Sequence, residues 1–207
     1  MQSAVPVQSR VATYTQTTPS SSLQLLDRTL ALVTLLGAAP VIAAAALVVV
    51  CLTRRSPFIL HRRVGRFSRP FHVIKIRTMW SEEDLEVPEN KIAGDPRVTS
   101  GFARFCRKYS IDEFPQLLQV VVGQMSLVGP RPVTRGEMTR YYGESEAEVT
   151  SIRPGLTGLW QVRGRNQCGY RRRRRLDVFL VRRYSAALYF RILLETVRAV
   201  ATGRNAW

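Results

Sequence analysis

Two adjacent carboxylates, Asp112 and Glu113, are the residues of this chain whose types and spacing best suit chemistry. Arg107 precedes them, and Arg131 follows within a Gly-Pro-Arg-Pro stretch. One carboxylate can attack a phosphorus atom and the other can bind a divalent metal. The arginines can neutralise the negative charge that develops. This group of residues is therefore typical of chemistry on a phosphate.

The same stretch also fits a structural interpretation. Ser110, followed three positions later by Glu113, matches a capping box that opens a helix. Such a helix would run to Val122 and end at Gly123, with a kink at Pro115. The two interpretations are compatible, because a carboxylate in the first turn of a helix is favoured by the helix dipole.

Composition restricts the kind of partner. The 207 residues carry a formal charge of +16 and have a pI near 11.1, which indicates an anionic partner. Nucleic acid, a phospholipid surface and a phosphorylated substrate all fit. The cysteines and histidines do not have the spacing of a disulfide framework or a metal site.

The N-terminal part predicts a tail and a membrane segment. Residues 1–22 are polar with one charge, which predicts a disordered tail. Residues 29–52 have no charge, and about 20 apolar residues suffice to cross a bilayer. Pro40 predicts a kink, and both flanks are basic. We expect residues 23–55 to form a re-entrant helix that enters and leaves by the cytoplasmic face, with a kinked span as the alternative. A buried helix of a soluble protein and a signal peptide are disfavoured.

Residues 56–200 predict one domain in a mainly helical α+β fold. Residues 58–60 and 71–76 are rich in β-favouring side chains and predict a short β-hairpin. Its second strand would place Lys75 and Arg77 on one face. A polar loop is expected at residues 81–97.

Further along, apolar residues at helical spacing over residues 102–109 predict a helix whose stripe packs in the core or on a membrane, with Arg107 on another face. The prolines around Arg131 predict a stiff turn that holds this arginine in one direction. Residues 153–158 predict a second such loop. Residues 171–175 are all arginine, and residues 176–200 predict an amphipathic helix suited to an anionic membrane surface.

Six motifs in order resemble the bacterial sugar transferases, the monotopic phosphoglycosyl transferases in their small catalytic-core form. The resemblance extends from about Leu25 to Val197. The motifs are Arg63-Val64-Gly65, Lys75-Ile76-Arg77-Thr78-Met79, Asp95-Pro96-Arg97-Val98-Thr99, the stretch 110–116, the stretch 125–132 and the stretch 153–162.

The resemblance implies an enzyme of the bacterial inner membrane with its catalytic domain on the cytoplasmic face. It implies Mg²⁺ as cofactor and a re-entrant helix with interfacial helices. The expected reaction transfers a sugar phosphate from a UDP-sugar to polyprenyl phosphate, such as undecaprenyl phosphate, and releases UMP. This would be the priming step of exopolysaccharide or glycoconjugate synthesis.

Residue roles follow from the same resemblance. Asp112 is the expected nucleophile, which forms a covalent phosphosugar-aspartate, and Glu113 is the expected metal ligand. Arg107 and Arg131 are expected to bind phosphate. Three further basic residues of the motifs, Lys75, Arg77 and Arg97, are also candidate phosphate ligands.

The sequence departs from the family pattern at four places. Ala39 stands where a serine usually precedes the proline of the helix break, and His61 replaces a usual glutamine. The run 171–175 is usually partly acidic. Tyr189 stands where an acidic residue is usual, which concerns the C-terminal substrate contacts and not the carboxylate pair.

Two other classes of function fit part of the sequence. A nucleic-acid-binding protein would explain the charge, but no nucleic-acid motif is present and the apolar segment has no role there. A non-enzymatic adaptor on anionic membrane lipid would leave Asp112 and Glu113 unused. A homodimer is compatible with the sequence, which leaves the oligomeric state, the sugar and the final glycan open.

Overall fold

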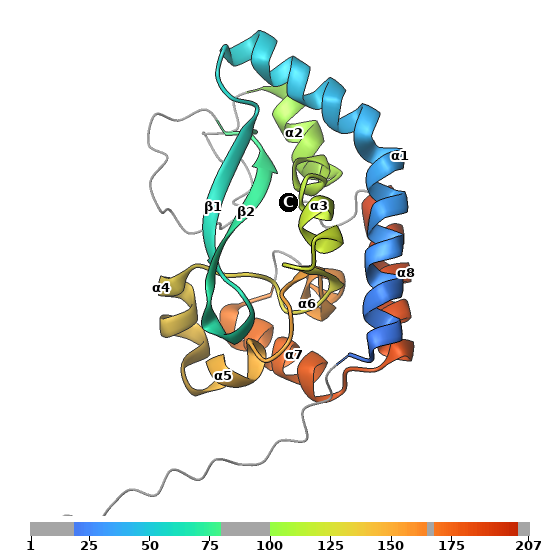
Figure 1. The fold of residues 1–207 in the computed structure, drawn as a ribbon. Coiled ribbons are helices and arrows are strands. Elements are labelled where there is room, and N and C mark those ends of the chain that lie inside the picture. Colours follow the sequence, from blue (N-terminus) through green and yellow to red (C-terminus); the bar gives the residue numbers. More distant parts are fainter. Residues whose placement is uncertain (1–18, 80–99, 165–167, 203–207) are drawn as a thin grey trace, which may run out of the picture.

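The protein is described by a computed structural model that covers residues 19–79, 100–164 and 168–202 (Figure 1). Helices dominate these residues, and the strands pair as β1 with β2 and β3 with β4, which confirms the predicted mainly helical α+β fold. The main elements are α1 (Ser21–Thr53), β1 (Phe58–Val64), β2 (Pro70–Ile76), α2 (Gly101–Lys108), α3 (Gln116–Val121), β3 (Ser126–Val128), α4 (Arg135–Glu137), α5 (Glu146–Val149), β4 (Gly155–Thr157), α6 (Leu159–Arg163), α7 (Tyr170–Arg182) and α8 (Ala186–Thr202). Short 3-10 or π turns are η1 (Arg66–Ser68), η2 (Ile111–Glu113), η3 (Met138–Tyr142) and η4 (Gly143–Ser145).

The long apolar helix α1 contains the predicted charge-free segment. It begins two positions before the predicted boundary at residue 23, where the side chain of Ser20 accepts a hydrogen bond from the backbone of Leu23 at 3.3 Å. The helix is long and apolar enough to cross a membrane, with a mean hydropathy of 2.7 over its most apolar window. Only 17% of that window is buried, which differs from the core helix of a soluble protein. The exposed apolar surface suits a non-aqueous environment.

The helix α1 is bent along its length (Figure 1). Pro40 lies inside it. A proline has no N–H to donate and its ring crowds the preceding turn, so the helix bends there. The kink predicted from Pro40 is therefore present, and it forms with Ala39 in place of the usual serine.

A buried carboxylate joins α1 to the rest of the molecule. Asp27 is 3% exposed, and its Oδ1 accepts hydrogen bonds from the backbone of Leu127 at 2.9 Å and from the hydroxyl of Tyr189 at 2.7 Å. These bonds connect α1 to β3 and to α8, which lies beside α1 (Figure 1). Tyr189 is thus a buried structural residue and does not contact the candidate site.

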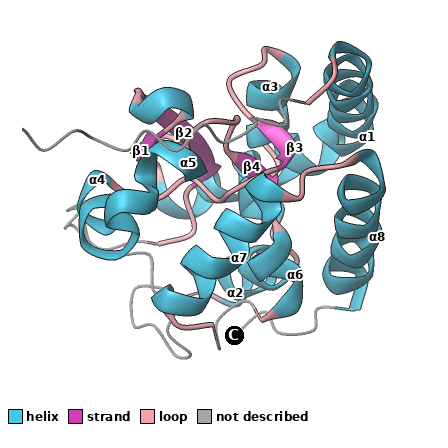
Figure 2. Cartoon of the chain, turned by 90° about the horizontal axis from the view of Figure 1, so that it is seen from below, coloured by secondary structure: helices cyan, strands magenta, loops and turns pink. Residues whose placement is uncertain are grey.

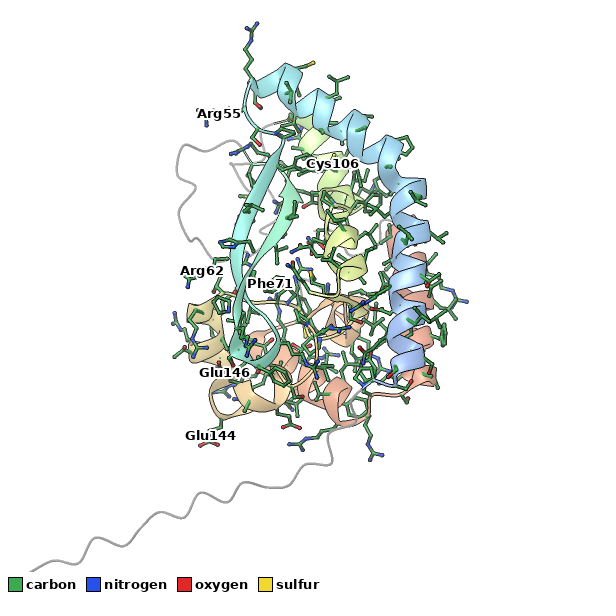
Figure 3. All side chains as sticks on the ribbon, viewed as in Figure 1. Arg55, Arg62, Phe71, Cys106, Glu144 and Glu146 are labelled. Carbon is green, nitrogen blue, oxygen red and sulfur yellow. The ribbon has the colours of Figure 1, made fainter. Side chains whose placement is uncertain are left out.

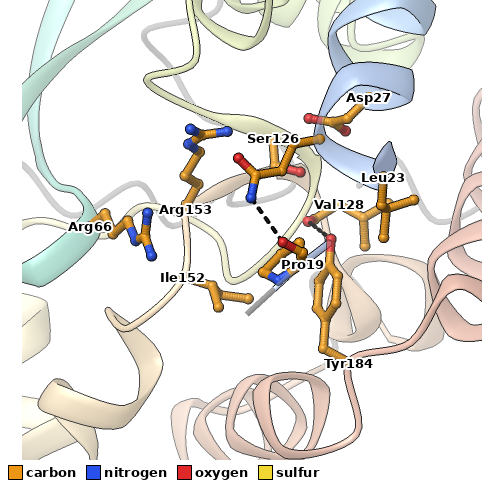
Figure 4. A pocket seen from close by; sticks show the side chains of 10 residues that line it. Pro19, Leu23, Asp27, Arg66, Ser126, Val128, Ile152, Arg153 and Tyr184 are labelled. Atoms are coloured by element: carbon orange, nitrogen blue, oxygen red, sulfur yellow. Dashed lines mark hydrogen bonds between the residues drawn. The ribbon is translucent and has the colours of Figure 1, made fainter. Parts of the chain in front are cut away.

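A small cavity of about 30 Å³ lies beside this joint (Figure 4). The hydroxyl of Tyr184 donates a hydrogen bond to the carbonyl of Val128 at 3.3 Å, and the side chain of Gln24 donates to the carbonyl of Pro19 at 2.8 Å. Arg66 and Arg153 line its polar side. The cavity thus lies between the start of α1, β3 and the segment that joins α7 to α8.

The hydrophobic core lies between α1, α3, β3 and α8. Small side chains of α1, Ala31 and Ala38, allow the close approach of the neighbouring elements. The buried residues that pack there include Leu117, Val120, Met125, Leu127, Val128, Leu159, Leu180, Tyr189 and Ile192. A second cluster joins the far part of α1 to Cys106, which Figure 3 labels among the side chains near that part of the helix.

The predicted hairpin is present as β1 and β2. The strands are antiparallel, with Phe58 opposite Ile76 and Val64 opposite Pro70. The strands are longer than the β-favouring stretches alone indicated. Lys75, in β2, is 8% exposed, so the hairpin holds a lysine inside the molecule.

The two proline loops meet through β3 and β4, which form a parallel pair near the middle of the molecule (Figure 2). The backbone N–H of Gly129 donates to the carbonyl of Thr157 at 2.9 Å, and that of Gly155 donates to the carbonyl of Pro130 at 2.8 Å. A Cβ at Gly155 would collide with the backbone of Gly129. This close approach requires glycine at both positions.

The capping box predicted at Ser110 is wrong. Ser110 has a φ of 57°, and its side chain makes no capping hydrogen bond. A 3-10 turn follows instead, and Pro115 lies directly before α3, where a proline needs no bond to the preceding turn. The predicted stop at Gly123 is confirmed by its φ of 82° after the end of α3.

The single amphipathic helix predicted over residues 176–200 is also wrong, because the chain forms two helices there. Helix α7 ends at Arg182, and the side chain of Ser185 accepts a hydrogen bond from the backbone of Leu188 at 3.3 Å at the start of α8. A serine at this position favours a new helix over the continuation of the old one. One face of α8 packs on α1, while Phe190, Leu194 and Val197 stay exposed.

The contact between the two loops makes a testable prediction. Gly155→Ala should lower the free energy of unfolding by about 1–3 kcal/mol, because overpacking a closed site displaces its neighbours. Gly136→Ala is the matched control, since a Cβ there meets nothing within 4 Å. Thermal unfolding of both variants in detergent measures the difference. Equal midpoints for Gly155→Ala and the unsubstituted protein would contradict the role given to this contact.

Candidate active site

The candidate carboxylates lie in the short turn η2, between α2 and α3. Asp112 is 3% exposed and Glu113 is 7% exposed. The left-handed backbone of Ser110 reverses the chain after α2 and brings the turn inside the molecule. Burying a charged group costs free energy unless the group is paired. The partners of the two carboxylates therefore determine which chemistry they can perform.

Glu113 is held by two basic side chains. Arg131 donates from Nη2 to Oε1 at 2.6 Å and from Nη1 to Oε2 at 3.3 Å, a bidentate pair. Lys75 Nζ lies 3.6 Å from Oε1 of the same carboxylate. The structure thus brings together three residues that the sequence proposed separately, from β2, η2 and the loop after β3. Charge-assisted bidentate bonds of this kind fix orientation as well as add stability.

Asp112 lies on the α2 side of the turn. Burial raises the pKa of the Cys106 thiol to about 11, and the charge of Asp112 nearby adds to this increase. Arg107, in the last turn of α2, is 7% exposed, although its helix face was predicted to lie outside the apolar stripe. Its Nε has no hydrogen-bond partner within the described residues. A buried guanidinium with an unused donor suits an anionic ligand.

The apolar stripe predicted for α2 is only partly buried. Cys106 is buried, but Phe105 is 53% exposed and packs on Tyr109 with their ring centroids 4.9 Å apart. The buried part of the stripe packs in the core as one alternative predicted, and its packing on a membrane surface, the other alternative, stays a prediction for the exposed part.

Two predicted phosphate ligands are not brought to the carboxylates by the described contacts. Arg77 donates from Nε to the carbonyl of Ser56 at 3.0 Å and from its backbone to that of Pro57 at 2.8 Å, beyond the end of β2. These contacts fix the connection between α1 and the hairpin. Arg97 lies outside the described residues, as does the loop predicted at residues 81–97.

A cavity of about 350 Å³ opens beside Glu113 and Arg131. Its other walls come from the membrane-type helix α1, from α8 and from α6. The residues from these three helices are Leu30, Thr34, Trp160, Gln161, Val162, Leu193, Thr196, Val197, Ala199 and Val200. Asp112 is buried behind this surface and does not line it. The lining of the cavity thus combines ionic groups with many apolar side chains.

Several residues that line this cavity were not predicted as site residues from the sequence. Trp160 and Arg173 line it, together with Glu137 and Tyr142. Trp160 belongs to one of the six motifs, but its side chain had no role there, and Arg173 is part of the run expected at the membrane surface. The hydroxyl of Tyr142 donates to Oδ2 of Asp177 at 2.8 Å. Burial raises the pKa of Asp177 to about 8.

A divalent metal fits the chemistry of the carboxylate pair. Within the described residues there is no group of three or more His, Cys, Asp and Glu that could enclose a metal ion. Mg²⁺ does not need one, because it is commonly bound by one or two carboxylates together with substrate phosphates and water. Glu113 supplies the hard carboxylate oxygens that such a site requires, and a bound metal would replace part of its contact with Arg131 and Lys75.

Comparison with known proteins identifies a family for this chain. The profile of the bacterial sugar transferase family matches residues 20–203. Similar proteins include the exopolysaccharide production protein ExoY of Sinorhizobium fredii, 38% identical over 73% of each chain. Another is the UDP-galactose-lipid carrier transferase of Erwinia amylovora, 38% identical over 90% of this chain and 42% of the relative.

A third is the undecaprenyl-phosphate galactose phosphotransferase of Salmonella typhimurium, 39% identical over 71% of this chain. The alignment covers 34% of that relative, so the chain spans less than half of the length of the two longer proteins. The match to the family nevertheless covers nearly all of the described residues, including the carboxylate pair and both proline loops. This chain therefore belongs to the bacterial sugar transferase family.

Proposed function

We propose that this protein transfers a sugar-1-phosphate from a UDP-sugar to a membrane polyprenyl phosphate, such as undecaprenyl phosphate, and releases UMP. One observation carries the proposal: Glu113 and Arg131 line a cavity that is also lined by residues of α1 and α8. Ionic groups suited to phosphates thus adjoin apolar helices suited to a lipid. Relatives named as galactose and glucose phosphotransferases of undecaprenyl phosphate support it, and the sugar of this chain stays open.

The first step is an attack on the donor. A carboxylate oxygen of Asp112 forms a bond to the β-phosphorus of the UDP-sugar. The bond from that phosphorus to the bridging oxygen breaks, and UMP leaves with this oxygen. The sugar phosphate is then held on Asp112 as an acyl phosphate, a covalent intermediate that divides one transfer into two easier ones. Asp112 must turn from its buried position toward the cavity for this step.

The second step regenerates the enzyme. An oxygen of the polyprenyl phosphate attacks the same phosphorus, and the bond to Asp112 breaks. The product is a polyprenyl diphosphate sugar, and the carboxylate of Asp112 is restored. The apolar wall from α1 and α8 would bind the lipid chain next to the covalent intermediate. Excluding water from this wall protects the acyl phosphate from hydrolysis.

The basic residues stabilise the negative charge of both steps. Lys75 and Arg131 are held in position by their ion pairs with Glu113. Arg107, in helix α2, contributes a buried guanidinium. Preorganised charges in a water-poor site act without reorganisation at the moment of reaction, and removing one such group costs on the order of 10²–10³-fold in rate. Glu113 would hold Mg²⁺, which would neutralise part of the diphosphate charge when bound.

The membrane arrangement is part of the same proposal. Arg28 lies in the first turns of α1, and Arg54 and Arg55 follow its end. Because Pro40 also bends the helix, α1 enters and leaves by the cytoplasmic face of the bacterial inner membrane. Arg171 and Arg175, two exposed arginines of α7, bind anionic lipid headgroups. A membrane adaptor without activity would need neither the ion-paired carboxylates nor the cavity beside them.

The activity is tested with purified protein in detergent. A panel of UDP-sugars should include one from which UMP is released, in a single turnover, before any polyprenyl phosphate is added. Addition of the lipid should make the release catalytic and yield a polyprenyl diphosphate sugar, measured by chromatography. No UMP from any sugar nucleotide, with or without lipid, would refute the proposed function.

The metal role of Glu113 makes a separate prediction. Glu113→Gln should raise the Mg²⁺ concentration needed for half-maximal UMP release by roughly tenfold or more, because an amide is a weaker ligand than a carboxylate. Glu148→Gln is the control, since Glu148 pairs with Arg182 at 2.6 Å outside the cavity. Titration of both variants with Mg²⁺ measures the change. An unaltered Mg²⁺ requirement for Glu113→Gln would exclude it as a metal ligand.

The topology of α1 can be measured in intact cells. Single cysteines at Ser22 and Arg55, in a background in which Cys51, Cys106 and Cys168 are replaced by alanine, lie near the two ends of the helix. A membrane-impermeant thiol reagent should label neither from outside and should label both after lysis. Labelling of the Ser22→Cys protein from outside would indicate a true span.

A further inference from the structure

The five arginines of residues 171–175 are not equivalent in the structure. They all belong to the first half of α7. Arg171, Arg172 and Arg175 are exposed, while Arg173 and Arg174 are half-buried. Arg173 lines the cavity that also contains Glu113 and Arg131. A single role at the membrane surface therefore does not describe the whole run.

Neighbouring groups hold the guanidinium of Arg173 in place. Its Cζ lies 4.4 Å from the ring centroid of Trp160 and 4.8 Å from that of Tyr170. Its Nε donates to the carbonyl of Cys168 at 2.8 Å. An arginine side chain normally loses considerable rotamer freedom when it binds a ligand, and these contacts remove much of that loss in advance.

The platform under Arg173 is itself supported. The hydroxyl of Tyr170 donates to Oε1 of Glu137 at 2.6 Å. Its ring stacks on Tyr141 with centroids 3.7 Å apart and planes 8° from parallel. Glu137 also accepts from the backbone of Thr134 in a capping box. The position of Arg173 is therefore set by several elements and not by α7 alone.

The charge of Arg173 is not neutralised by a carboxylate. Within residues 19–79, 100–164 and 168–202 it forms no ion pair within 4.0 Å, and Nε is the atom through which it hydrogen-bonds. Glu137 and Asp177 lie nearby but accept from Tyr170 and Tyr142. Arg131, by contrast, is held bidentately by Glu113. The Nη donors of Arg173 are thus available to a ligand in the cavity.

We propose that Arg173 is a substrate-binding residue whose guanidinium binds a phosphate ester group in the cavity. The proposal rests on the proposed function and adds a specific contact to it. A guanidinium fits phosphate through two parallel hydrogen bonds, and its charge is strengthened in a cavity with an apolar wall. Two sources of this group exist, the diphosphate of the sugar nucleotide and the phosphate of the polyprenyl acceptor.

The test compares Arg173→Gln with Arg172→Gln, an exposed neighbour on the same helix. Arg173→Gln should raise the KM of one substrate about 10- to 100-fold, because a lost charge-assisted contact is typically of this size. A rise in the KM of the UDP-sugar during UMP release assigns the contact to the donor. A rise confined to polyprenyl phosphate assigns it to the acceptor. Arg172→Gln should keep both values.

Two controls separate binding from structure. Arg173→Lys keeps the charge without the planar fork and should recover part of the lost affinity. The thermal midpoint of Arg173→Gln in detergent should stay near that of Arg172→Gln. A lower thermal midpoint of Arg173→Gln together with unchanged KM values would show that Arg173 only stabilises the packing of α7 against Trp160. This result would overturn the proposal.

The failure of the proposal also differs from the failure of the proposed function. If the unsubstituted protein releases no UMP, the function itself is wrong. If it releases UMP and Arg173→Gln has the KM values of Arg172→Gln, the function stands and the role of Arg173 is refuted. A thermal shift of the unsubstituted protein by UDP, absent in Arg173→Gln, would assign the donor contact independently of turnover.

Discussion

Close contact between the backbones of Gly129 and Gly155 is the constraint that positions the ionic part of the site. The two glycines allow the proline loops to exchange hydrogen bonds across β3 and β4. The side chain of Arg131 points in one fixed direction from this contact, because the prolines on either side of it restrict the backbone. It meets Glu113, and Lys75 reaches the same carboxylate from the hairpin. Three distant stretches of sequence are thereby held at one point before any substrate arrives.

The second constraint is the position of this ionic group relative to the membrane helices. The start of α1 is tied to β3 and α8 through the buried Asp27. The same two helices, α1 and α8, form the apolar wall of the cavity beside Glu113. Much of the remaining surface of α1 is apolar and exposed, and in the proposed function this surface would face the lipid. The proposed function would therefore couple phosphate chemistry to lipid binding through the packing of one helix.

Much of this could be predicted from the sequence, where local chemistry decides the structure. The hairpin, the bend at Pro40 and the stop at Gly123 follow from residue types that permit few alternatives. Contacts between distant segments could not be predicted in this way. Ser110 has the spacing of a helix cap but adopts a left-handed backbone, and the carboxylate of Glu113 pairs with Arg131. Arg173 looks identical to its neighbours in sequence, and only the packing of α7 on α6 distinguishes it.

The central claim is that Asp112, buried beside the ion-paired Glu113, carries the sugar phosphate between donor and acceptor. The most direct measurement incubates the protein with a UDP-sugar labelled with ³²P at the β-phosphate, without lipid, and locates the label by peptide mapping. We expect label on Asp112, its absence from Asp112→Asn, and its loss when polyprenyl phosphate is added. Label on Glu113, or equal labelling of the Asp112→Asn protein, would contradict this claim.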